Sequence, residues 1–334
     1  MKKFILITVC IIMMSMTASA DTFNKAMLVH NGQVTLYDSD KVQDAINAAS
    51  DGDVIYLTLG TFKPFNVTKK ITIRGVGETS IVDGDVTISI PGSPKLTSPV
   101  LEALSVAGKI NVGSQVDDMI IRKCKITNFT IGAQVDGAVL DRCYITSTLI
   151  LSSYIKGMTV VNTKLFNVIA NSGATQNTTF VNCNLYRLYV ANFSGTILNS
   201  VIYLTVNSNN NTGYDNSKLL STVLFNTLLY TNNNYVTLGS SSVAQNCYYQ
   251  SARVSYSINN STYYGLLKES CECAFDKSGL QSNGYLGTDG TVVGIEGGET
   301  PFTLEPSVPK VTSSDVKLDN DKKQLNVKLT VSPQ

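Results

Sequence analysis

The 334-residue chain contains no tryptophan and a single histidine, His30, and only 15% of its residues are charged. One histidine excludes metal centres built from several imidazole ligands, and any histidine base would depend on that one position. Lysine and arginine number 26 against 25 for aspartate and glutamate, so the net charge is +1. Because no excess positive field would attract phosphates, we expect no nucleic-acid partner.

Long apolar runs are also scarce, and the chain begins with the principal one. Met1-Lys2-Lys3 precedes an apolar run from Phe4 to Met14, and Ala18-Ser19-Ala20 follows. A basic start, a short apolar centre and an Ala-x-Ala site are typical of a secretory signal peptide over residues 1–20, and the run is too short to span a membrane. We therefore expect an exported protein (periplasmic, on the outer surface or extracellular) without a transmembrane span.

A short motif repeats through the middle of the chain, as in Ile121-Arg122-Lys123-Cys124-Lys125-Ile126 and Leu140-Asp141-Arg142-Cys143-Tyr144-Ile145. Apolar and polar residues alternate around a small central residue, which is typical of a strand with one buried face. One such strand every ~20 residues predicts an all-β fold, a right-handed parallel β-helix with ~20-residue coils. The small central residues, which we call markers, are Cys124, Cys143, Thr163, Cys183, Ser200, Thr227 and Cys247.

The position before the marker is occupied by asparagine in the later copies. Lys123 and Arg142 precede the first two markers, and five asparagines follow in the same column. Neighbouring coils lie ~4.8 Å apart, so these amides could hydrogen-bond along the stack, and we expect an asparagine ladder. The alternative is a row of amides that binds sugar hydroxyls. The five are Asn162, Asn182, Asn199, Asn226 and Asn246.

The N-terminal part, residues 21–59, is predicted to cap the β-helix. Asn31-Gly32 between two alternating segments predicts a tight hairpin, and we expect His30 beside it to lack partners for catalysis or metal binding. The segment from Asp40 to Ala49 has the pattern of a capping helix, with Asp40 as its N-cap and Gln43 three residues later.

The β-helix itself is assigned to residues 60–300, and residues 301–334 are predicted to form a small β tail. Leu325, Val327, Leu329 and Val331 alternate with polar residues, which indicates a half-exposed strand. The segment Val316-Lys317-Leu318 is a candidate partner for it.

Two segments carry a family resemblance. Val42-Gln43-Asp44-Ala45-Ile46-Asn47-Ala48-Ala49, followed by Gly52-Asp53-Val54-Ile55 and Gly60-Thr61-Phe62, resembles the opening of the pectate-lyase-like superfamily, the pectin lyase fold. Leu286 to Ile295, with Gly297, Gly298 and Pro301-Phe302, resembles the tail of uncharacterised secreted β-helix proteins from Bacteroidetes. The resemblance implies a right-handed β-helix over residues 40–305. It implies less about activity, because that superfamily holds lyases, hydrolases, epimerases and proteins without a known reaction.

Six cysteines follow residue 20, and four of them are markers. Parallel Cβ vectors on neighbouring coils would keep the sulfur atoms ~4.8 Å apart, whereas a disulfide prefers a Cβ spacing of ~3.8 Å. We therefore expect free thiols in the core. Cys271 and Cys273 are left open, either as a strained bridge or as two unrelated thiols.

Lyases of the superfamily abstract a proton with an arginine or lysine while carboxylates hold Ca²⁺. This chemistry needs acids and a base that converge on one exterior face of the β-helix. In the repeat Asp117 stacks on Asp136, and Arg122 stacks on Asp141. The lyase hypothesis makes Asp117 and Asp136 Ca²⁺ ligands and an arginine the base; otherwise we expect no cofactor. The alternative is ion pairing between coils on a solvated face. The catalytic candidates are Asp117, Asp136, Asp141, Arg122 and Arg142, with Asp118 nearby.

A column of aromatic residues three positions after the marker is the candidate for carbohydrate binding. Alternation places its members outside the core, where ring faces can pack on the C–H faces of sugars. The alternative is that the rings pack on one another or under a loop. The aromatic stripe consists of Phe166, Tyr186, Tyr203 and Tyr230.

The sequence therefore favours an exported β-helix protein that contacts a polysaccharide or cell-surface glycan through an exterior face, without catalysis of the pectate-lyase type. One alternative is a polysaccharide lyase or glycoside hydrolase acting on an acidic glycan. Another is a structural or adhesive protein of the cell envelope.

Overall fold

The computed structural model describes residues 24–92, 94–113, 115–132, 134–151, 155–170, 175–190, 193–205, 218–232, 237–238, 243–250, 277–299, 301–303, 310–319 and 324–332. The predicted signal peptide, Cys271 and Cys273 lie outside these residues. None of the helices in the described ranges is long and apolar enough to cross a membrane.

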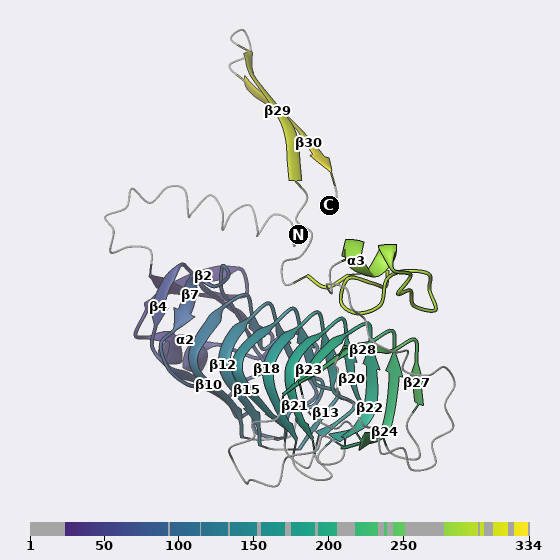
Figure 1. The fold of residues 1–334 in the computed structure, drawn as a ribbon. Helices are drawn as coiled ribbons and strands as arrows, with labels where there is room; N and C mark the ends of the chain where they lie inside the picture. Colours follow the sequence, from purple (N-terminus) through teal and green to yellow (C-terminus); the bar gives the residue numbers. More distant parts are fainter. Residues whose placement is uncertain are drawn as a thin grey trace.

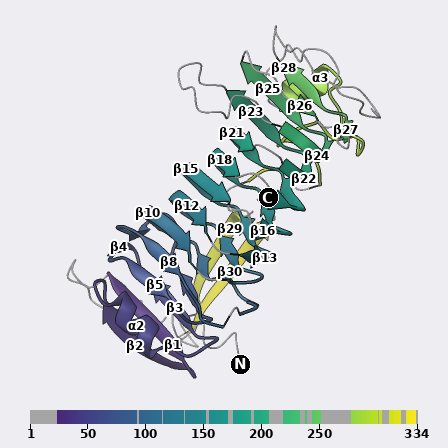
Figure 2. The same cartoon turned by 90° about the horizontal axis from the view of Figure 1, so that it is seen from below.

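The protein is a parallel β-helix, a solenoid of about 7 turns built almost entirely from strands. Two long sheets, which we call sheet A and sheet B, and a three-stranded short sheet run along the solenoid axis (Figures 1 and 2). Sheet A contains β1 (Lys25–His30), β2 (Gln33–Asp38), β3 (Val54–Leu57), β6 (Thr72–Arg74), β9 (Leu101–Glu102), β11 (Ile120–Arg122), β14 (Val139–Asp141), β17 (Thr159–Val161), β20 (Thr178–Val181), β22 (Phe193–Leu198), β24 (Lys218–Phe225), β26 (Thr237–Leu238) and β27 (Val243–Gln245).

The other two sheets complete each coil. Sheet B contains β4 (Gly60–Phe62), β5 (Phe65–Val67), β7 (Ser80–Val82), β8 (Val86–Ile88), β10 (Ser105–Val112), β12 (Lys125–Ile131), β15 (Tyr144–Leu151), β18 (Lys164–Ala170), β21 (Asn184–Val190), β23 (Val201–Thr205), β25 (Leu228–Asn232) and β28 (Tyr248–Gln250). The short sheet contains β13 (Val135–Asp136), β16 (Ile155–Lys156) and β19 (Thr175–Gln176).

The repeat found in the sequence is the structural repeat. In sheet A, Ile121 pairs with Leu140, which pairs in turn with Val160 of the following coil. All seven markers are buried, with exposed fractions of 2% or less, so they form the inward stack that alternation predicts. The core is one continuous cluster of aliphatic, phenylalanine and methionine side chains that also includes the four marker cysteines.

A single residue in the left-handed conformation turns the chain from sheet A into sheet B, and this residue is the one before the marker. Its φ is 55° at Lys123, 52° at Arg142 and 48° at Asn162. Asparagine tolerates this conformation better than most residues, which explains the column. The corner N–H bonds to the next coil, as from Asn162 N to Val181 O over 3.0 Å.

Side-chain bonding along the asparagine column remains a prediction. Within the described part of the chain, the Oδ1 atoms of Asn162 and Asn199 are buried without a hydrogen-bond partner. The bonds that demonstrably stack the corners are therefore those of the backbone.

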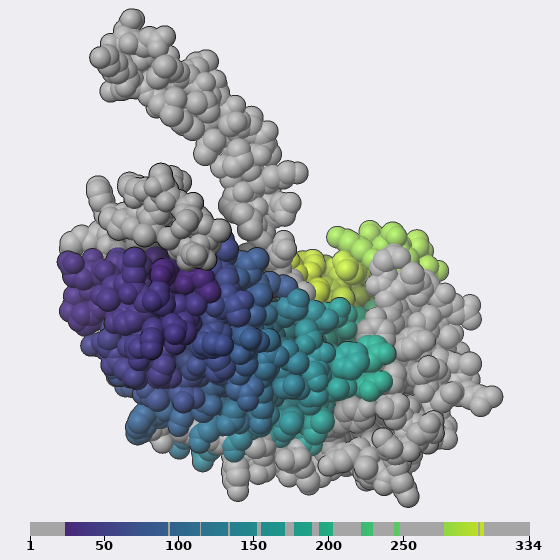
Figure 3. Space-filling view, turned by 90° about the vertical axis from the view of Figure 1, so that its left-hand side faces the viewer, coloured from purple at the N-terminus to yellow at the C-terminus, as the bar shows by residue number. Residues whose placement is uncertain are grey.

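The predicted hairpin and capping helix close the N-terminal end, which faces the viewer in Figure 3. Strands β1 and β2 are antiparallel around Asn31 (φ 49°) and Gly32 (φ 78°), which confirms the Asn-Gly turn. The prediction for His30 was incomplete, because its Nδ1 lies 2.8 Å from Asp53 Oδ2. Asp53 Oδ2 also accepts a bond from Ser50 N, so the contact ties the hairpin to the turn that follows the helix.

The helix α2 (Val42–Ala48) covers the first coil with Val42, Ala45 and Ile46. The prediction of Asp40 as N-cap was wrong: Lys41 holds that position and makes no side-chain capping bond. Asp40 instead lies in a turn closed by the bond from Lys41 N to Asp38 O.

The C-terminal part of the range assigned to the β-helix lies outside the coils. Residues 277–299, which we call the strap, begin with α3 (Lys277–Ser282) and pass over the outer surface of the last coils (Figure 1). Leu280, Val292 and Val293 of the strap form a small apolar cluster with Val201 and Leu228 of sheet B.

Glycines let the strap approach the asparagine corners closely. A Cβ on Gly287 would lie 2.7 Å from Asn226 Cγ, and one on Gly298 would lie 2.6 Å from Asn199 Nδ2. The strap also bonds to the corner, from Gly294 N to Asn226 O and from Thr288 N to Asn226 Oδ1. The glycine-rich pattern in the sequence thus reflects backbone packing against the solenoid wall.

The predicted β tail is an antiparallel hairpin of β29 (Lys310–Asp319) and β30 (Gln324–Ser332). Val316 pairs with Val327 and Leu318 with Leu325, as the alternation predicts. In Figure 1 this hairpin extends away from the solenoid.

The four marker cysteines are free thiols in the core, as predicted. Burial raises the pKa of Cys124, Cys183 and Cys247 to about 12, and it raises the pKa of Cys143 well above its usual value. A thiol that holds its proton and lies away from solvent is a poor nucleophile.

These thiols should be inert in the folded protein. Iodoacetamide at pH 8 is expected to leave the four marker cysteines unmodified until denaturant is added, as read by peptide mass spectrometry. The free energy of unfolding should also fall as the pH rises above about 9, because unfolded thiols lose protons there while the folded ones keep them. Modification of Cys124 or Cys183 before unfolding would contradict the inward stack.

Candidate functional site

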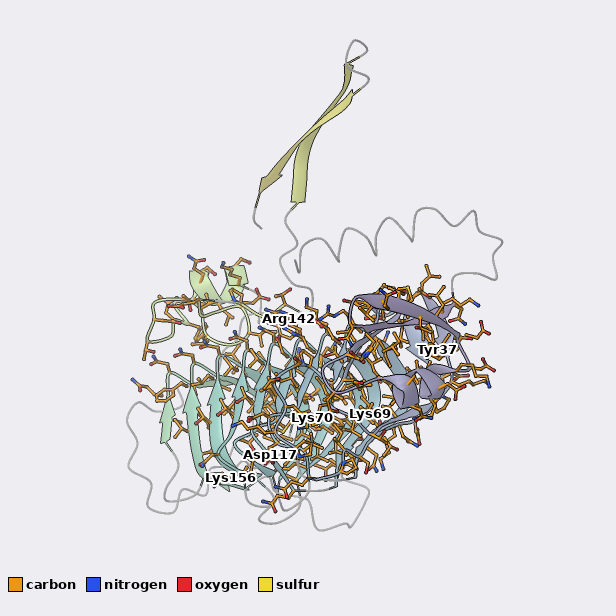
Figure 4. All side chains as sticks on the ribbon, turned by 180° about the vertical axis from the view of Figure 1, so that it is seen from behind. Tyr37, Lys69, Lys70, Asp117, Arg142 and Lys156 are labelled. Atoms are coloured by element: carbon orange, nitrogen blue, oxygen red, sulfur yellow. The ribbon has the colours of Figure 1, made fainter. Side chains whose placement is uncertain are left out.

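The structure separates the lyase candidates into two places on the solenoid. Asp117 and Asp136 lie along the short sheet, whereas Arg122, Asp141 and Arg142 lie at the corner between sheets A and B. Figure 4 shows Asp117 and Arg142 toward opposite edges of the solenoid. The five candidates therefore do not converge on one reaction centre.

Next to the corner, strand pairing stacks Arg74, Glu102, Arg122 and Asp141 with one member per coil, and we call this column the ion-pair ladder. Glu102 is nearly buried and bridges two arginines: Arg74 Nε lies 2.7 Å from its Oε2, and Arg122 Nε lies 3.4 Å from its Oε1. Arg142 Nη1 contacts Asp141 Oδ2 at 2.9 Å. Opposite charges thus alternate up the stack, and these arginines are engaged with protein carboxylates.

Glu102 is the member that the sequence analysis missed. The segment Leu101-Glu102-Ala103-Leu104 matches the repeat one coil before Cys124, and Ala103 has the corner conformation, with φ 54°. Extending the alignment by one coil would have placed Glu102 beside Arg122.

The second place is a column of charges beside the short sheet. Asp117 and Asp136 come together as predicted, because Asp136 N donates to Asp117 Oδ1 over 3.2 Å. Lys95 pairs with Asp117 through the backbone and contacts Asp118 Oδ2 at 3.0 Å, and Lys156 pairs with Asp136 through the backbone. In the described part of the chain, no three His, Cys, Asp or Glu side chains gather as a metal site would require.

Two members of the aromatic stripe, Phe166 and Tyr186, lie on the outer face of sheet B. Phe166 and Tyr186 are 40% and 38% exposed, so alternation placed them correctly. Strand pairing sets Tyr203 directly beside Tyr230, which continues the column, but the side chains of these two residues lie outside the described part.

The two described rings stack on each other. Their centroids are 4.8 Å apart and their planes differ by 9°. The distance equals the spacing of neighbouring strands, so each ring lies directly above its equivalent on the next coil. The ring faces turned toward each other are therefore closed to a sugar. The outer faces and the edges of the pair remain, and the ring edges carry the positive part of the aromatic quadrupole.

Cations accompany the rings. Arg187 Cζ lies 5.5 Å from the centroid of Phe166 and 5.4 Å from that of Tyr186, and Lys164 Nζ lies 5.0 Å from the centroid of Tyr144. These distances are within the range of cation–π attraction. The outer face of sheet B is thus a mixed aromatic and basic surface.

Sequence alternation missed Arg187, because strict alternation turns the residue after Tyr186 inward. In two strands of sheet B the buried residues are three apart at this point, Leu185 and Leu188 in β21 and Leu165 and Val168 in β18. Two successive residues, such as Tyr186 and Arg187, therefore lie outside the core. In the sequence, the aliphatic residue five positions after the marker, Val168 or Leu188, indicates this spacing.

No family model, no curated protein and no solved structure matches the chain. The parallel β-helix and the geometry of its faces are therefore the basis for the functional proposal.

The ion-pair ladder predicts a stability effect at Glu102. Glu102→Gln removes the negative charge between Arg74 and Arg122 while keeping the side-chain shape, so the unfolding free energy should drop by ~1–3 kcal/mol. Lys95→Gln, which breaks the exposed pair with Asp118, should cost less than ~1 kcal/mol. Denaturant unfolding of both variants measures the difference. Equal stability of the two variants would mean that Glu102 and its arginines do not stabilise the fold.

Proposed function

We propose that the protein is exported under the direction of its N-terminal signal peptide, belongs among the pectate-lyase-like β-helices, and binds polysaccharide without catalysing its cleavage. The binding surface in this proposal is the outer face of sheet B. The observation that carries the proposal is the exposed, stacked pair of Phe166 and Tyr186 on that face.

Two properties of the pair support a contact role. Two adjacent exposed rings form an apolar patch, and covering such a patch with a partner is favourable because it releases ordered water. The stripe also repeats at the coil spacing through Tyr203 and Tyr230, so an extended chain could make several weak contacts in series.

The self-stacking of the rings changes the expected mode of contact. Sugar C–H faces can reach only the outer faces of the stack and the ring edges, and hydroxyl groups can bond to the phenol of Tyr186. Binding through this face would thus be more polar than binding by a row of open ring faces.

A non-catalytic role agrees with the state of the lyase candidates. Arg122 and Arg142 contact Glu102 and Asp141, and Asp117 Oδ1 accepts the backbone N–H of Asp136. A proton-abstracting base must reach the substrate, whereas these two arginines contact carboxylates of the protein itself. Ca²⁺ enters only under the lyase alternative.

Binding is tested by affinity electrophoresis of the protein through gels that contain cell-wall and capsular glycans. The wild type should be retarded by at least one glycan, and Tyr186→Ala with Tyr203→Ala should abolish the retardation because it removes adjacent members of the stripe. Tyr37→Ala, on β2 and outside sheet B, serves as the matched control. Equal retardation of wild type and double variant would contradict the proposed face.

The absence of lyase activity is tested separately. The protein incubated with polygalacturonate and Ca²⁺ should form no unsaturated uronate ends, measured by ultraviolet absorbance. The proposal would be wrong if product appeared and if Asp117→Ala with Asp136→Ala abolished it in a folded protein.

A further inference from the structure

Sheet A ends, at the N-terminal cap, in a strand that is paired on one side only. Strand β2 lies beyond β1 in the sheet, and no other described strand lies beyond β2 (Figure 2). The Asn-Gly turn pairs His30 with Gln33, so β2 is bonded to β1 through Gln33 and every second residue after it. The backbone N–H and C=O groups of Val34 and Leu36 therefore point away from β1, along an open edge.

The strands of sheet B in the first coil have their edges closed by side chains. In β4, Thr61 O accepts a bond from Asn24 Nδ2 over 2.7 Å. In β5, Asn66 N donates to Gln43 Oε1 over 2.8 Å, and Gln43 Nε2 donates to Asn66 O over 3.3 Å. Among the described residues, no side chain bonds the outward backbone groups of β2 in this way. Strand β2 thus keeps an open edge at an end of the solenoid where other edges are closed.

Strand β2 also lacks the features that keep natural edge strands from pairing. Such edges commonly carry lysine, proline or a bulge. The six residues of β2 pair with β1 in unbroken register and include neither lysine nor proline. The one charged residue, Asp38, lies at the end of the strand and forms an ion pair with Lys25 of β1. Nothing in the strand therefore opposes the addition of a further strand.

An apolar patch on the outer face of sheet A ends at this edge. The residues of β1 that alternate with the core residues Ala26 and Leu28 lie on the outer face, together with their partners in β2 and β3. Leu36 is 45% exposed. The edge patch, as we call it, consists of Val34 and Leu36 in β2, Met27 and Val29 in β1, and Val54 and Tyr56 in β3.

We propose that the edge of β2 binds a second copy of this chain, by antiparallel pairing of the two β2 strands about a two-fold axis at Thr35. In that register Val34 lies opposite Leu36 of the second copy, and Leu36 lies opposite Val34 of the second copy. Each of these pairs exchanges both backbone hydrogen bonds, because these residues direct their N–H and C=O groups to the open edge. The inference does not depend on the glycan-binding proposal.

The edge is complementary to itself, as a two-fold interface requires. Val34 and Leu36 both belong to the outer face, so their pairing joins the edge patches of the two copies into one apolar surface. Asp38 comes opposite Gly32 of the second copy, so no like charges are brought together. A strand of another protein could use the same backbone groups, but it would have to supply matching apolar residues that a second copy already carries.

Sedimentation velocity of the purified protein tests the inference. One strand edge with a short apolar patch is a small interface, so we expect a monomer–dimer equilibrium with a Kd of about 1–100 µM. Leu36→Lys places an ammonium group in the centre of the interface and should weaken dimerisation by at least about tenfold. Leu286→Lys makes the same change at a leucine of the strap that is 39% exposed, and should change the Kd less than about twofold.

Cysteine cross-linking tests the register without changing the apolar residues. The axis places Thr35 opposite Thr35 of the second copy, at a non-hydrogen-bonded pair whose Cα atoms lie ~4.5 Å apart, within the range of a disulfide. Thr35→Cys should therefore form a disulfide-linked dimer under mild oxidation, read by non-reducing electrophoresis. Gln33→Cys, on the same face of the same strand, is the matched control, because the register sets Gln33 opposite Tyr37 and far from its own equivalent. The wild type gives the baseline for the native cysteines.

The outcomes decide the proposal. A monomer at every concentration would overturn it and leave the edge to a strand of another protein. A dimer that persists in Leu36→Lys, when circular dichroism shows this variant to be folded, would place the contact elsewhere and also overturn it. If Leu36→Lys unfolds, the cross-link decides: a disulfide in Thr35→Cys supports the interface, and its absence overturns it. Cross-linking of Gln33→Cys as readily as Thr35→Cys would overturn the two-fold register.

Discussion

Each coil from Ala103 to Asn246 has one residue held in the left-handed conformation at the corner between sheets A and B. The backbone N–H of that residue donates to the carbonyl that precedes the corner of the next coil, and the same bond recurs from Lys123 to Asn226. Because the corner recurs at the same point in these coils, the strands that meet at it keep the same register from coil to coil. The buried marker, the ion-pair ladder and the outer face of sheet B all keep their columns for this reason.

The same register makes the two sides of the corner chemically different. Before the corner, opposite charges fall on adjacent coils and neutralise one another, as Glu102 does for Arg74 and Arg122. After the corner, rings and cations fall on adjacent coils without carboxylates in the strands. In a solenoid, equivalent residues of successive coils lie ~4.8 Å apart in one column. A residue type that recurs in the repeat therefore covers a whole face of the molecule. The ion pairs before the corner stabilise the fold, and the face after the corner is the one that we propose as a binding surface.

The strap packs against the corners and the outer surface of the last coils. Its glycines allow its backbone to lie against the asparagine corners of the last coils, and its apolar residues bury Val201 and Leu228. These two residues occupy a column that is polar or charged in earlier coils, where Lys125 and Lys164 stand. In this column the residues are polar or charged where the sheet is exposed, and they become apolar where the strap covers the sheet.

The sequence by itself determined the β-helix, the inward markers, the two end hairpins and the outward position of Phe166 and Tyr186. All of these depend on period-2 alternation and on turn residues, which are local properties. Tertiary structure alone decided that the lyase candidates lie at opposite edges, that Glu102 joins the arginines, and that the rings close on each other. It also decided that Arg187 lies outside the core, because two residues rather than one separate the buried Leu185 and Leu188 of β21. These depend on which coils are neighbours and on how strands deform when they stack, and a single strand's sequence does not contain that information.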